Sequence, residues 1–445
     1  MIIERTLMGE LIRWKESTRR KPLILKGVRQ CGKTWLLRHF GEERFENTVY
    51  FNFERTKELA SFFDGAYDPQ QILLNLSAYA RQRIQAQSTL LIFDEVQTCP
   101  RALNSLKYFC EQNPEYAIAA AGSLLGISLT SPEGFPVGKV DFLELTPCTF
   151  KEYLQTADPM LADYCGKVSL SPIPEAFAIR LGNYFREYLA FGGMPAVMSV
   201  FLDTHDVIET DHELAAVLQS YEPDFSKHIP SRDIPKLFMI WQSIPVQFAR
   251  ENSKFIYGEV RQGARAKDLE DAMQWLLNAC MVQKVNLVQT PELPLLANMD
   301  RKSFKLYVAD VGILRKLAGL APAVVLSNQD VFGEFKGRLV ENYVLQQFRA
   351  MSIEPVCYWT NPTGRAEVDF LFQNEDIVVP VEVKSGLNLA AQSLRIYRDK
   401  YSPALALRTS MSNLRLDDRL LNLPLYLLGE MPRLLAEARA RVNKD

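Results

Sequence analysis

The sequence predicts a multidomain α/β protein, and three observations support this prediction. The chain has 445 residues, more than one hydrophobic core normally supports, so two or three domains are expected. Up to about residue 150, short apolar segments alternate with helical ones, which is the pattern of a parallel sheet flanked by helices. A helical middle follows, and a second α/β region begins near residue 330.

The first α/β region contains five strand candidates. Each is a short apolar run of the kind found in buried parallel strands. They cover Leu23–Leu25, Thr48–Phe53, Leu90–Phe93, Ala117–Ala121 and Asp141–Leu145, with helical segments such as Pro69–Gln87 between them. Pro147 and the segment Phe150–Leu154 mark a change of character after the last strand.

A phosphate-binding loop follows the first of these strands. Residues 27–34 fit the pattern G-x-x-x-x-G-K-S/T at every fixed position, between an apolar strand and a helix. The glycines let backbone N–H groups turn toward phosphate oxygens, Lys33 can reach the β and γ phosphates, and the Thr34 hydroxyl can ligate Mg²⁺. The helix presents its N-terminus to the anion. The predicted nucleotide-binding residues are Gly27, Val28, Arg29, Gln30, Cys31, Gly32, Lys33, Thr34 and Trp35.

A second motif indicates nucleotide hydrolysis. The continuous apolar run Thr89–Phe93 reads as a buried strand and ends in Asp94 and Glu95, which is the form of a Walker B segment. Asp94 is expected to hold Mg²⁺ through its water shell. Glu95, one residue further on, is expected to orient or deprotonate the attacking water.

The middle of the chain reads as helical to about residue 250, with a tight turn at Phe191–Pro195. Beyond it, the helix Leu269–Leu277 and the strands Met281–Val288 and Phe304–Val308 suggest a winged helix. Basic residues that could face nucleic acid lie before and at the start of that helix: Lys254, Arg261, Arg265 and Lys267. Acidic residues are interleaved with them, so a solvated interdomain spacer is an equal alternative to a DNA-reading helix.

The last region is expected to gather charged side chains on neighbouring elements. A helix is predicted at Leu339–Arg349, and strands near Tyr358–Trp359, at Glu367–Phe372 and at Ile377–Val383. The last two strands are joined by turn-forming residues 373–376, which predicts an antiparallel hairpin.

Four of those charged residues form a candidate metal site. Glu382 and Lys384 are two residues apart on one strand, so their side chains point to one face. Asp369 on the neighbouring strand can join them, and Glu341 in the preceding helix offers a third carboxylate. The three carboxylates can hold Mg²⁺ against a phosphodiester, and the metal lowers the pKa of its bound water to make a nucleophile. Lys384 would orient that water or offset charge on the phosphate.

Glu341, Asp369 and Glu382-x-Lys384 resemble the motif of the PD-(D/E)XK restriction-endonuclease-like superfamily, in the order helix, strand and hairpin. The proline that names the motif is absent before Asp369, where Val368 stands. The resemblance implies a C-terminal restriction-endonuclease-like α/β fold. A working nuclease and a non-cutting nuclease fold are both open, because a site can hold the residues without the geometry that catalysis needs.

The wider sequence resembles a bacterial and archaeal family of AAA+-like ATPases that carry the domain of unknown function DUF4143. The resemblance covers nearly the whole chain and includes the segments Arg29–Thr34, Asp94–Gln97, Gly122–Gly126, Phe135–Val140, Tyr188–Pro195 and Lys305–Gly312. It implies ATP as the nucleotide, which the loop itself does not encode. It also implies that Ser123 is a sensor-1 residue that bonds the γ-phosphate or its attacking water. Relatives often carry arginine where this chain has Lys139; if Lys139 acts on a neighbour's nucleotide, the active form is a homo-oligomer.

These inferences divide the chain into four predicted domains. Residues 1–155 form a P-loop AAA+-like ATPase domain and residues 156–250 a helical domain. Residues 251–325 form a winged-helix-like domain, and residues 326–445 a PD-(D/E)XK nuclease-like domain that corresponds to DUF4143.

Composition bounds the surroundings and partners. Apolar residues make up 47% of the chain, which is usual for soluble globular proteins, and the net charge of −2 excludes a globally basic nucleic-acid coat protein. The seven cysteines contain no C-x-x-C pair and only four histidines are present, which argues against structural zinc. The odd cysteine count and the charged N-terminus indicate a reducing compartment without a signal peptide. No apolar run is long enough to span a membrane, so we expect a cytoplasmic protein with no membrane partner.

Two functions from different classes follow. The first is an ATPase whose nucleotide cycle controls a Mg²⁺-dependent nuclease that acts on DNA. The second is a nucleotide-gated binding or signalling switch, in which a non-cutting nuclease fold recognises protein or nucleic acid. A small-molecule kinase would also use a P-loop, but no segment of the chain reads as an acceptor lid.

Overall fold

The computed structural model describes residues 2–65, 67–122, 136–250, 254–327, 333–386 and 392–444. The chain forms two compact units, which are described separately. The first comprises Glu4–Thr146 and Gln274–Met281; the second comprises Met1–Ile3, Pro147–Met273 and Val282–Asp445. Within the described residues, no helix has both the length and the apolar character needed to cross a membrane.

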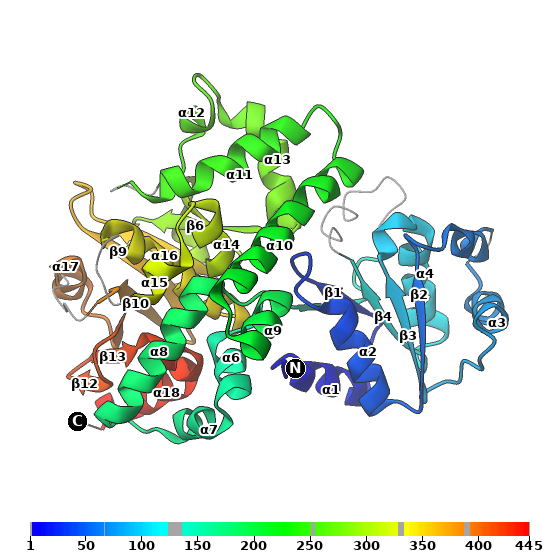
Figure 1. The fold of residues 1–445 in the computed structure, drawn as a ribbon, viewed down its shortest axis with the longest axis horizontal. Coiled ribbons are helices and arrows are strands. Elements are labelled where there is room, and N and C mark those ends of the chain that lie inside the picture. Colours follow the sequence, from blue (N-terminus) through cyan, green and yellow to red (C-terminus); the bar gives the residue numbers. More distant parts are fainter. Residues whose placement is uncertain are drawn as a thin grey trace. The chain divides into compact units, whose positions relative to one another are not determined.

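The first unit is built on a five-stranded parallel sheet (Figure 1). Its strands, in spatial order, are β2 (Asn47–Asn52), β3 (Thr89–Asp94), β4 (Ala117–Ala121), β1 (Leu23–Lys26) and β5 (Asp141–Glu144). Its helices are α1 (Met8–Glu16), α2 (Lys33–Arg44), α3 (Pro69–Ala80) and α4 (Pro100–Gln112). The five predicted strands and their parallel arrangement are therefore confirmed.

The interior strand β3 is buried along its whole length, which is why it reads as a continuous apolar run. Because alternate side chains of a strand point to opposite faces, Leu91 and Phe93 face one side of the sheet, where they pack in one cluster with Leu76 of α3 and Leu106 of α4. Helix α2 lies on the opposite face (Figure 1). Helices thus cover both faces of the sheet.

The second unit begins with a helical segment. Its helices are α6 (Phe150–Ala157), α7 (Pro159–Lys167), α8 (Glu175–Phe191), α9 (Pro195–Thr204), α10 (Val207–His228), α11 (Ile234–Phe248) and α12 (Tyr257–Val260), while α13 (Ala266–Asn278) spans the boundary between units. Helix α6 starts at a capping box in which the Thr149 hydroxyl and the Glu152 carboxylate each accept a bond from the other's backbone N–H. The predicted helical middle is confirmed.

The predicted turn between α8 and α9 is a site of close packing. Gly193 N donates to Asp310 Oδ2 at 2.6 Å. A Cβ at Gly192 would lie 2.1 Å from Asp310 Oδ1, and one at Gly193 would lie 2.0 Å from the Cys148 carbonyl oxygen. Glycine is therefore required at both positions, since any side chain would displace a buried partner.

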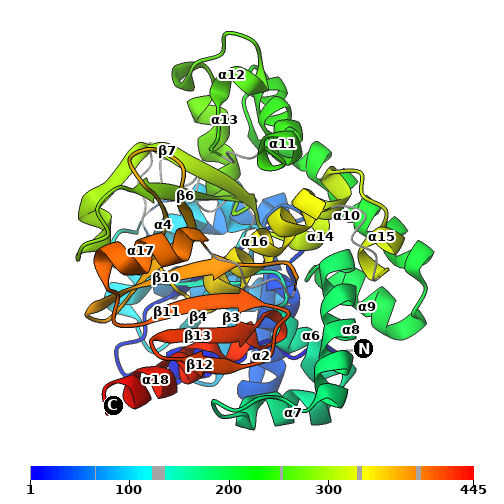
Figure 2. The same cartoon turned by 90° about the vertical axis from the view of Figure 1, so that its left-hand side faces the viewer.

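The rest of the second unit is an eight-stranded mixed sheet with helices around it (Figure 2). The strand order is β12 (Arg415–Asp417), β13 (Leu420–Pro424), β11 (Ala406–Ser410), β10 (Ile377–Val383), β9 (Glu367–Asn374), β8 (Val356–Thr360), β6 (Val282–Val288) and β7 (Met299–Val308). The helices are α14 (Val311–Leu317), α15 (Pro322–Leu326), α16 (Gly333–Ala350), α17 (Gln392–Tyr401) and α18 (Met431–Val442). Strands β9 and β10 form the predicted antiparallel hairpin.

The predicted wing of a winged helix differs from what is observed. Strands β6 and β7 do form an antiparallel pair, but β6 also pairs in parallel with β8, where Asn286 lies opposite Cys357. The backbone N–H and C=O groups on a free strand edge can bond to another strand, and for β6 that strand is β8, which begins at Val356. The strands before and after the expected domain boundary near residue 325 therefore belong to one sheet.

Candidate functional site

The two nucleotide-binding motifs meet at the carboxyl edge of the first sheet. The loop of residues 27–34 follows β1, and Asp94 ends β3, with β4 between these two strands. In a parallel sheet this edge is where ligands bind. The Thr34 hydroxyl donates to Asp94 Oδ2 at 3.0 Å, so the two predicted magnesium ligands lie within one hydrogen bond of each other.

The loop has the backbone that its glycines allow. Gly32 has φ +94°, in the left-handed region that favours glycine. A Cβ at Gly27 would lie 2.1 Å from the Leu145 carbonyl oxygen, so this position also excludes a side chain. The Lys33 ammonium donates to the carbonyl oxygens of Gly27 at 2.8 Å and Val28 at 2.9 Å. The Lys33 side chain therefore lies inside the predicted phosphate-binding loop.

The remaining predicted loop residues differ in exposure. Cys31 is buried, and its thiol donates to the Leu145 carbonyl oxygen at 3.3 Å. Gln30 and Trp35 are exposed, whereas Arg29 is partly buried. The Trp35 ring stacks on His39, one turn along α2, with ring centroids 4.8 Å apart.

Asp94 has a second donor that the sequence analysis did not include. The Tyr50 hydroxyl on β2 donates to Asp94 Oδ2 at 2.6 Å, and Asn52 Nδ2 donates to that hydroxyl at 3.1 Å. Burial and then the bond to Asp94 raise the pKa of Tyr50 to about 12, so the phenol keeps its proton and remains a donor. The sequence feature that could have indicated this contact is a polar side chain, Tyr50, on the strand next to the one that ends in Asp94.

Glu95 lies directly after Asp94 in a left-handed conformation, with φ +52° and ψ +38°. Such a backbone costs about 1–2 kcal/mol for a residue with a side chain. Gln97 Nε2 donates to Glu95 Oε2 at 2.6 Å, and the Thr98 hydroxyl donates to the Glu95 carbonyl oxygen at 2.7 Å. The Gln97 bond orients the predicted catalytic carboxylate, and the Thr98 bond holds the Glu95 backbone.

Two further predicted residues of this unit have different outcomes. Ser123 lies outside the described residues, although β4, which leads toward it, lies between β1 and β3. Lys139 pairs with Glu111 of the same chain, with Nζ 3.0 Å from Oε1, and this bond raises the pKa of Lys139. A role for Lys139 on a neighbouring nucleotide stays a prediction, and it would require that pair to break.

The predicted constellation of the second unit is brought together by three elements. Glu341 lies on α16, Asp369 on β9, Glu382 on β10, and Lys384 directly follows β10. Glu341 and Glu382 are buried, and Lys384 Nζ lies 2.7 Å from Glu382 Oε1. Asp369 Oδ2 accepts a bond from Val383 N at 2.8 Å, which ties β9 to the end of β10.

The carboxylates of this constellation interact strongly. Burial, followed by the nearby charges of Glu341 and Glu382, raises the pKa of Asp369 well above its usual value. Burial also raises the pKa of Glu382, although Lys384 opposes this. Burial by itself would lower the pKa of Lys384, but the Glu382 carboxylate outweighs it and raises that pKa.

Further charged and polar residues join the constellation, and sequence reasoning did not include them. Lys305 on β7 is fully buried (0% exposed) and forms an ion pair with Glu367 on β9. Arg338 Nη1 lies 2.8 Å from Glu341 Oε1, and the Tyr307 hydroxyl donates to Glu341 Oε2 at 3.4 Å. Lys305 and Tyr307 were missed because β7 had been interpreted as part of a separate wing.

The fit of this constellation to Mg²⁺ is partial. Carboxylate oxygens are suitable ligands, and Glu382 Oε2 is buried without a hydrogen-bond partner, which a cation would relieve. Within the part of the chain that the structure describes, however, no group of three or more acidic, histidine or cysteine side chains is arranged to hold a metal ion. Arg338 and Lys384 already neutralise one oxygen each of Glu341 and Glu382. The metal site of Glu341, Asp369 and Glu382 therefore stays a prediction.

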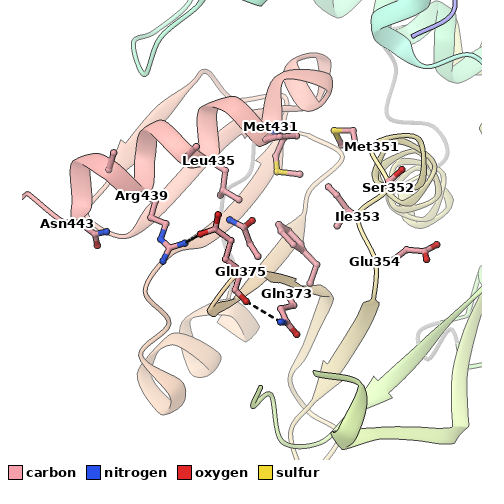
Figure 3. Close-up of a pocket in the computed structure, with 15 residues that line it drawn as sticks. Met351, Ser352, Ile353, Glu354, Gln373, Glu375, Met431, Leu435, Arg439 and Asn443 are labelled. Atoms are coloured by element: carbon pink, nitrogen blue, oxygen red, sulfur yellow. Dashed lines mark hydrogen bonds and ion pairs between the residues drawn. The ribbon is translucent and has the colours of Figure 1, made fainter. Parts of the chain in front are cut away.

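A cavity of about 670 Å³ lies elsewhere in the second unit (Figure 3). It is lined by residues 351–354 after α16, by the β9–β10 turn and by α18, where Arg439 Nη1 lies 2.9 Å from Glu375 Oε2. None of the predicted site residues lines it. The cavity is therefore not part of either candidate site.

Comparison with known families agrees with the site geometry of the first unit. Residues 19–154 match the AAA domain family, whose members are P-loop ATPases. This matched region is called the AAA domain. Such a domain implies ATP and typically Mg²⁺. Residues 182–323 match a domain of unknown function, DUF8612, and residues 336–428 match another, DUF4143. The predicted DUF4143 region is confirmed, DUF8612 had not been predicted, and neither description mentions a nuclease.

Comparisons with individual proteins add little. No curated protein matches the chain. Among solved structures, the Walker-type ATPase PABY2304 of Pyrococcus abyssi is 14% identical, with 71% of this chain and 96% of that chain covered and a TM-score of 0.47. Orc1 of Aeropyrum pernix in complex with DNA is 12% identical, with 73% and 95% covered and a TM-score of 0.29. The RuvB Holliday junction branch migration motor of Thermotoga maritima is 17% identical, with 65% and 90% covered and a TM-score of 0.29. Likeness at this level carries no conclusion about function.

Proposed function

We propose that the AAA domain binds ATP with Mg²⁺ at residues 27–34 and hydrolyses it. The observation that carries this proposal is the 3.0 Å hydrogen bond between Thr34 and Asp94, because one cation could then contact the Thr34 hydroxyl directly and the Asp94 carboxylate through its water shell. The ion supplies charge stabilisation on the β and γ phosphates when it is bound.

Each residue of the AAA site has a role in this proposal. The loop amides and the N-terminus of α2 bind phosphate oxygens, and Lys33 exchanges its carbonyl partners for the β and γ phosphates. Thr34 and Asp94 hold Mg²⁺, while Tyr50 orients the Asp94 carboxylate. Glu95 accepts a proton from the attacking water or orients it, while Gln97 holds its Oε2.

The test is nucleotide binding by Lys33→Ala beside Lys57→Ala, which removes an exposed lysine of the same unit. We expect Lys33→Ala to lose ATP binding in calorimetry and Lys57→Ala to bind as the wild type does. Equal affinity of Lys33→Ala and the wild type would remove the loop from nucleotide binding.

A finer proposal is that the nucleotide cycle controls metal-dependent cleavage of DNA in the second unit. Two observations favour it: the buried, unpartnered Oε2 of Glu382, and the crowding of carboxylates that raises the pKa of Asp369. Both are expected of a site built to take a cation. In this proposal Glu341, Asp369 and Glu382 hold the ion, which supplies an activated water, and Lys384 positions that water.

The alternative is a nucleotide-gated switch whose second unit binds protein or nucleic acid without cutting. It is favoured by the cations that already occupy the cluster, since Arg338 and Lys384 each neutralise a carboxylate that a metal would need. A cluster compensated in this way is stable without metal.

One experiment separates the two. The full chain is incubated with single-stranded, double-stranded and branched DNA, with and without ATP and with Mg²⁺ or Mn²⁺, beside Asp369→Ala and the exposed-site control Asp271→Ala. Cleavage that needs the metal and disappears only in Asp369→Ala, with ATP hydrolysis intact, supports the nuclease. Intact DNA under every condition, together with ATP-dependent retention of DNA or protein, supports the switch.

A further inference from the structure

Arg5 is a buried arginine that contacts the ATP-binding loop from outside it. Arg5 lies just before α1 and is only 7% exposed. Nη1 donates to the Cys31 carbonyl oxygen at 2.9 Å, and Nη2 donates to the Thr146 carbonyl oxygen at 2.5 Å. One guanidinium therefore joins the phosphate-binding loop to the segment that follows β5.

Other contacts hold the loop to that same segment. The Cys31 thiol donates to the Leu145 carbonyl oxygen at 3.3 Å. Gly27 lies so close to this oxygen that an added Cβ would be 2.1 Å away, and Leu145 N donates to the Lys26 carbonyl oxygen at 2.8 Å. Gly27 and Cys31 of the loop thus contact Leu145, and Arg5 links Cys31 to Thr146. A shift of the loop would disturb these contacts.

The segment is also where the chain leaves the first unit. Thr146 is the last residue of its main segment, and Pro147 belongs to the second unit. In the second unit, Cys148 N donates to the Gly193 carbonyl oxygen at 2.7 Å, and Thr149 caps α6. Thr146, which bonds Arg5, is therefore separated by Pro147 alone from Cys148, which bonds Gly193 in the turn between α8 and α9.

We infer that Arg5 is a positioning residue that holds the loop to Leu145 and Thr146 and conveys its nucleotide-dependent movement to residues 147–149. The inference rests on the proposed binding of ATP at this loop. A planar guanidinium with two fixed carbonyl partners transmits displacement of either one, whereas a lysine forms bonds without this fixed geometry. Arg5 would act through the loop and would not contact the nucleotide itself.

The test measures ATP affinity, kcat and amide hydrogen exchange in the wild type, Arg5→Ala and Arg5→Lys. Arg13→Ala, which removes an exposed arginine of α1, is the matched control. In the wild type, ATP should change exchange at the amides of Leu145 and Cys148. Arg5→Ala should raise the Kd for ATP about 10- to 100-fold, as expected for lost hydrogen bonds from a charged group, with kcat at saturating ATP less affected. Exchange at Cys148 should then no longer respond to ATP, and Arg5→Lys should restore part of the affinity.

The outcomes separate this inference from the proposed function. A wild type that does not bind ATP overturns the proposed function. A wild type that binds ATP while exchange at Cys148 stays constant overturns the inference alone, as does an Arg5→Ala variant with unchanged affinity and response. If Arg5→Ala does not fold, Arg5→Lys decides: wild-type affinity together with a wild-type Cys148 response overturns the inference, and a loss in either supports it.

Discussion

The AAA site and the acidic constellation of the second unit use similar residue types in different ways. In the AAA site, one loop and one strand end supply the groups, and Thr34 and Asp94 are bonded directly to each other. In the constellation, Glu341 is paired with Arg338 on the same helix and Glu382 with Lys384 just after its own strand, while Lys305 on β7 pairs with Glu367 on β9. The AAA site is organised by one loop and one strand end, whereas the constellation forms only when α16, β7, β9 and β10 come together.

The difference determines how each site depends on the rest of the molecule. A loop formed by glycines and a helix N-terminus depends on contacts within its own unit, such as those with Arg5 and Leu145. Buried charges keep their arrangement only while every partner is present, because an unpaired buried ion costs several kcal/mol. We therefore expect substitutions in the AAA site to alter chemistry and substitutions in the constellation to alter stability.

The largest expected effect is on stability. Lys305→Met should lower the free energy of unfolding by about 3–5 kcal/mol, because it leaves Glu367 beside a buried site without its partner. Lys302→Met, on the exposed part of the same strand, should change it by less than about 0.5 kcal/mol. Urea denaturation of both variants checks this. Adding Glu367→Leu to Lys305→Met should recover most of the loss, and no recovery would contradict the pairing.

Next in size is the effect of Glu95→Gln on ATP hydrolysis. Because the amide cannot accept a proton from water, kcat should fall about 10²- to 10³-fold while ATP binding is retained. Steady-state hydrolysis and calorimetric titration measure the two quantities, with the exposed Glu46→Gln as the control. A kcat equal to that of the wild type would show that Glu95 has no catalytic role. It would also contradict the expectation that substitutions in the AAA site alter chemistry.

A smaller effect is expected for Tyr50→Phe, which removes one donor from Asp94 and keeps the ring. The loss of a bond to a charged group corresponds to about 1.5–3 kcal/mol, so kcat/KM for ATP should fall about tenfold or more in the presence of limiting Mg²⁺. Raising Mg²⁺ should restore part of it if Tyr50 orients the carboxylate. Tyr79→Phe, at an exposed tyrosine, should behave as the wild type.

The smallest effect concerns pH. The raised pKa of Asp369 means that its folded form holds a proton more tightly than its unfolded form, so this group favours folding below the unfolded pKa. That contribution is lost as pH rises through the raised pKa. Asp369→Asn should therefore be more stable than the wild type at pH 8, by about 1 kcal/mol, and should lose this advantage toward pH 4. Thermal denaturation across this range, with Asp271→Asn as the control, measures it; an advantage that grows toward low pH would contradict the assignment.

Local patterns were sufficient for much of the first unit. The five apolar runs became the five parallel strands, since a strand buried on both faces reads as continuously apolar. The spacing of Gly27, Gly32 and Thr34 predicted a loop whose glycines are required by its backbone and by Leu145. The pairing of Asp94 with Thr34 followed from topology, because parallel strands end at one edge of their sheet.

Contacts between distant segments could not be read in the same way. Strands β6 and β7 were recognised as a pair, but their partner β8 begins at Val356, and the pattern of a strand does not say which other edge it meets. That pairing brought Lys305 and Tyr307 to the carboxylates. Tyr50 and Arg5 were missed because their roles depend on partners far along the chain, Asp94 and Thr146.

The sequence by itself determined the strands of the AAA domain, its phosphate-binding loop and the identity of the ionisable residues in both sites, since these depend on short-range spacing and side-chain chemistry. Only the tertiary structure decided that Lys305 pairs with Glu367, which strands share a sheet, and that Arg5 bonds both the loop and Thr146, the last residue of the first unit's main segment. The physical reason is that electrostatic pairing and hydrogen bonding depend on distance in space, which residue spacing specifies only within one element.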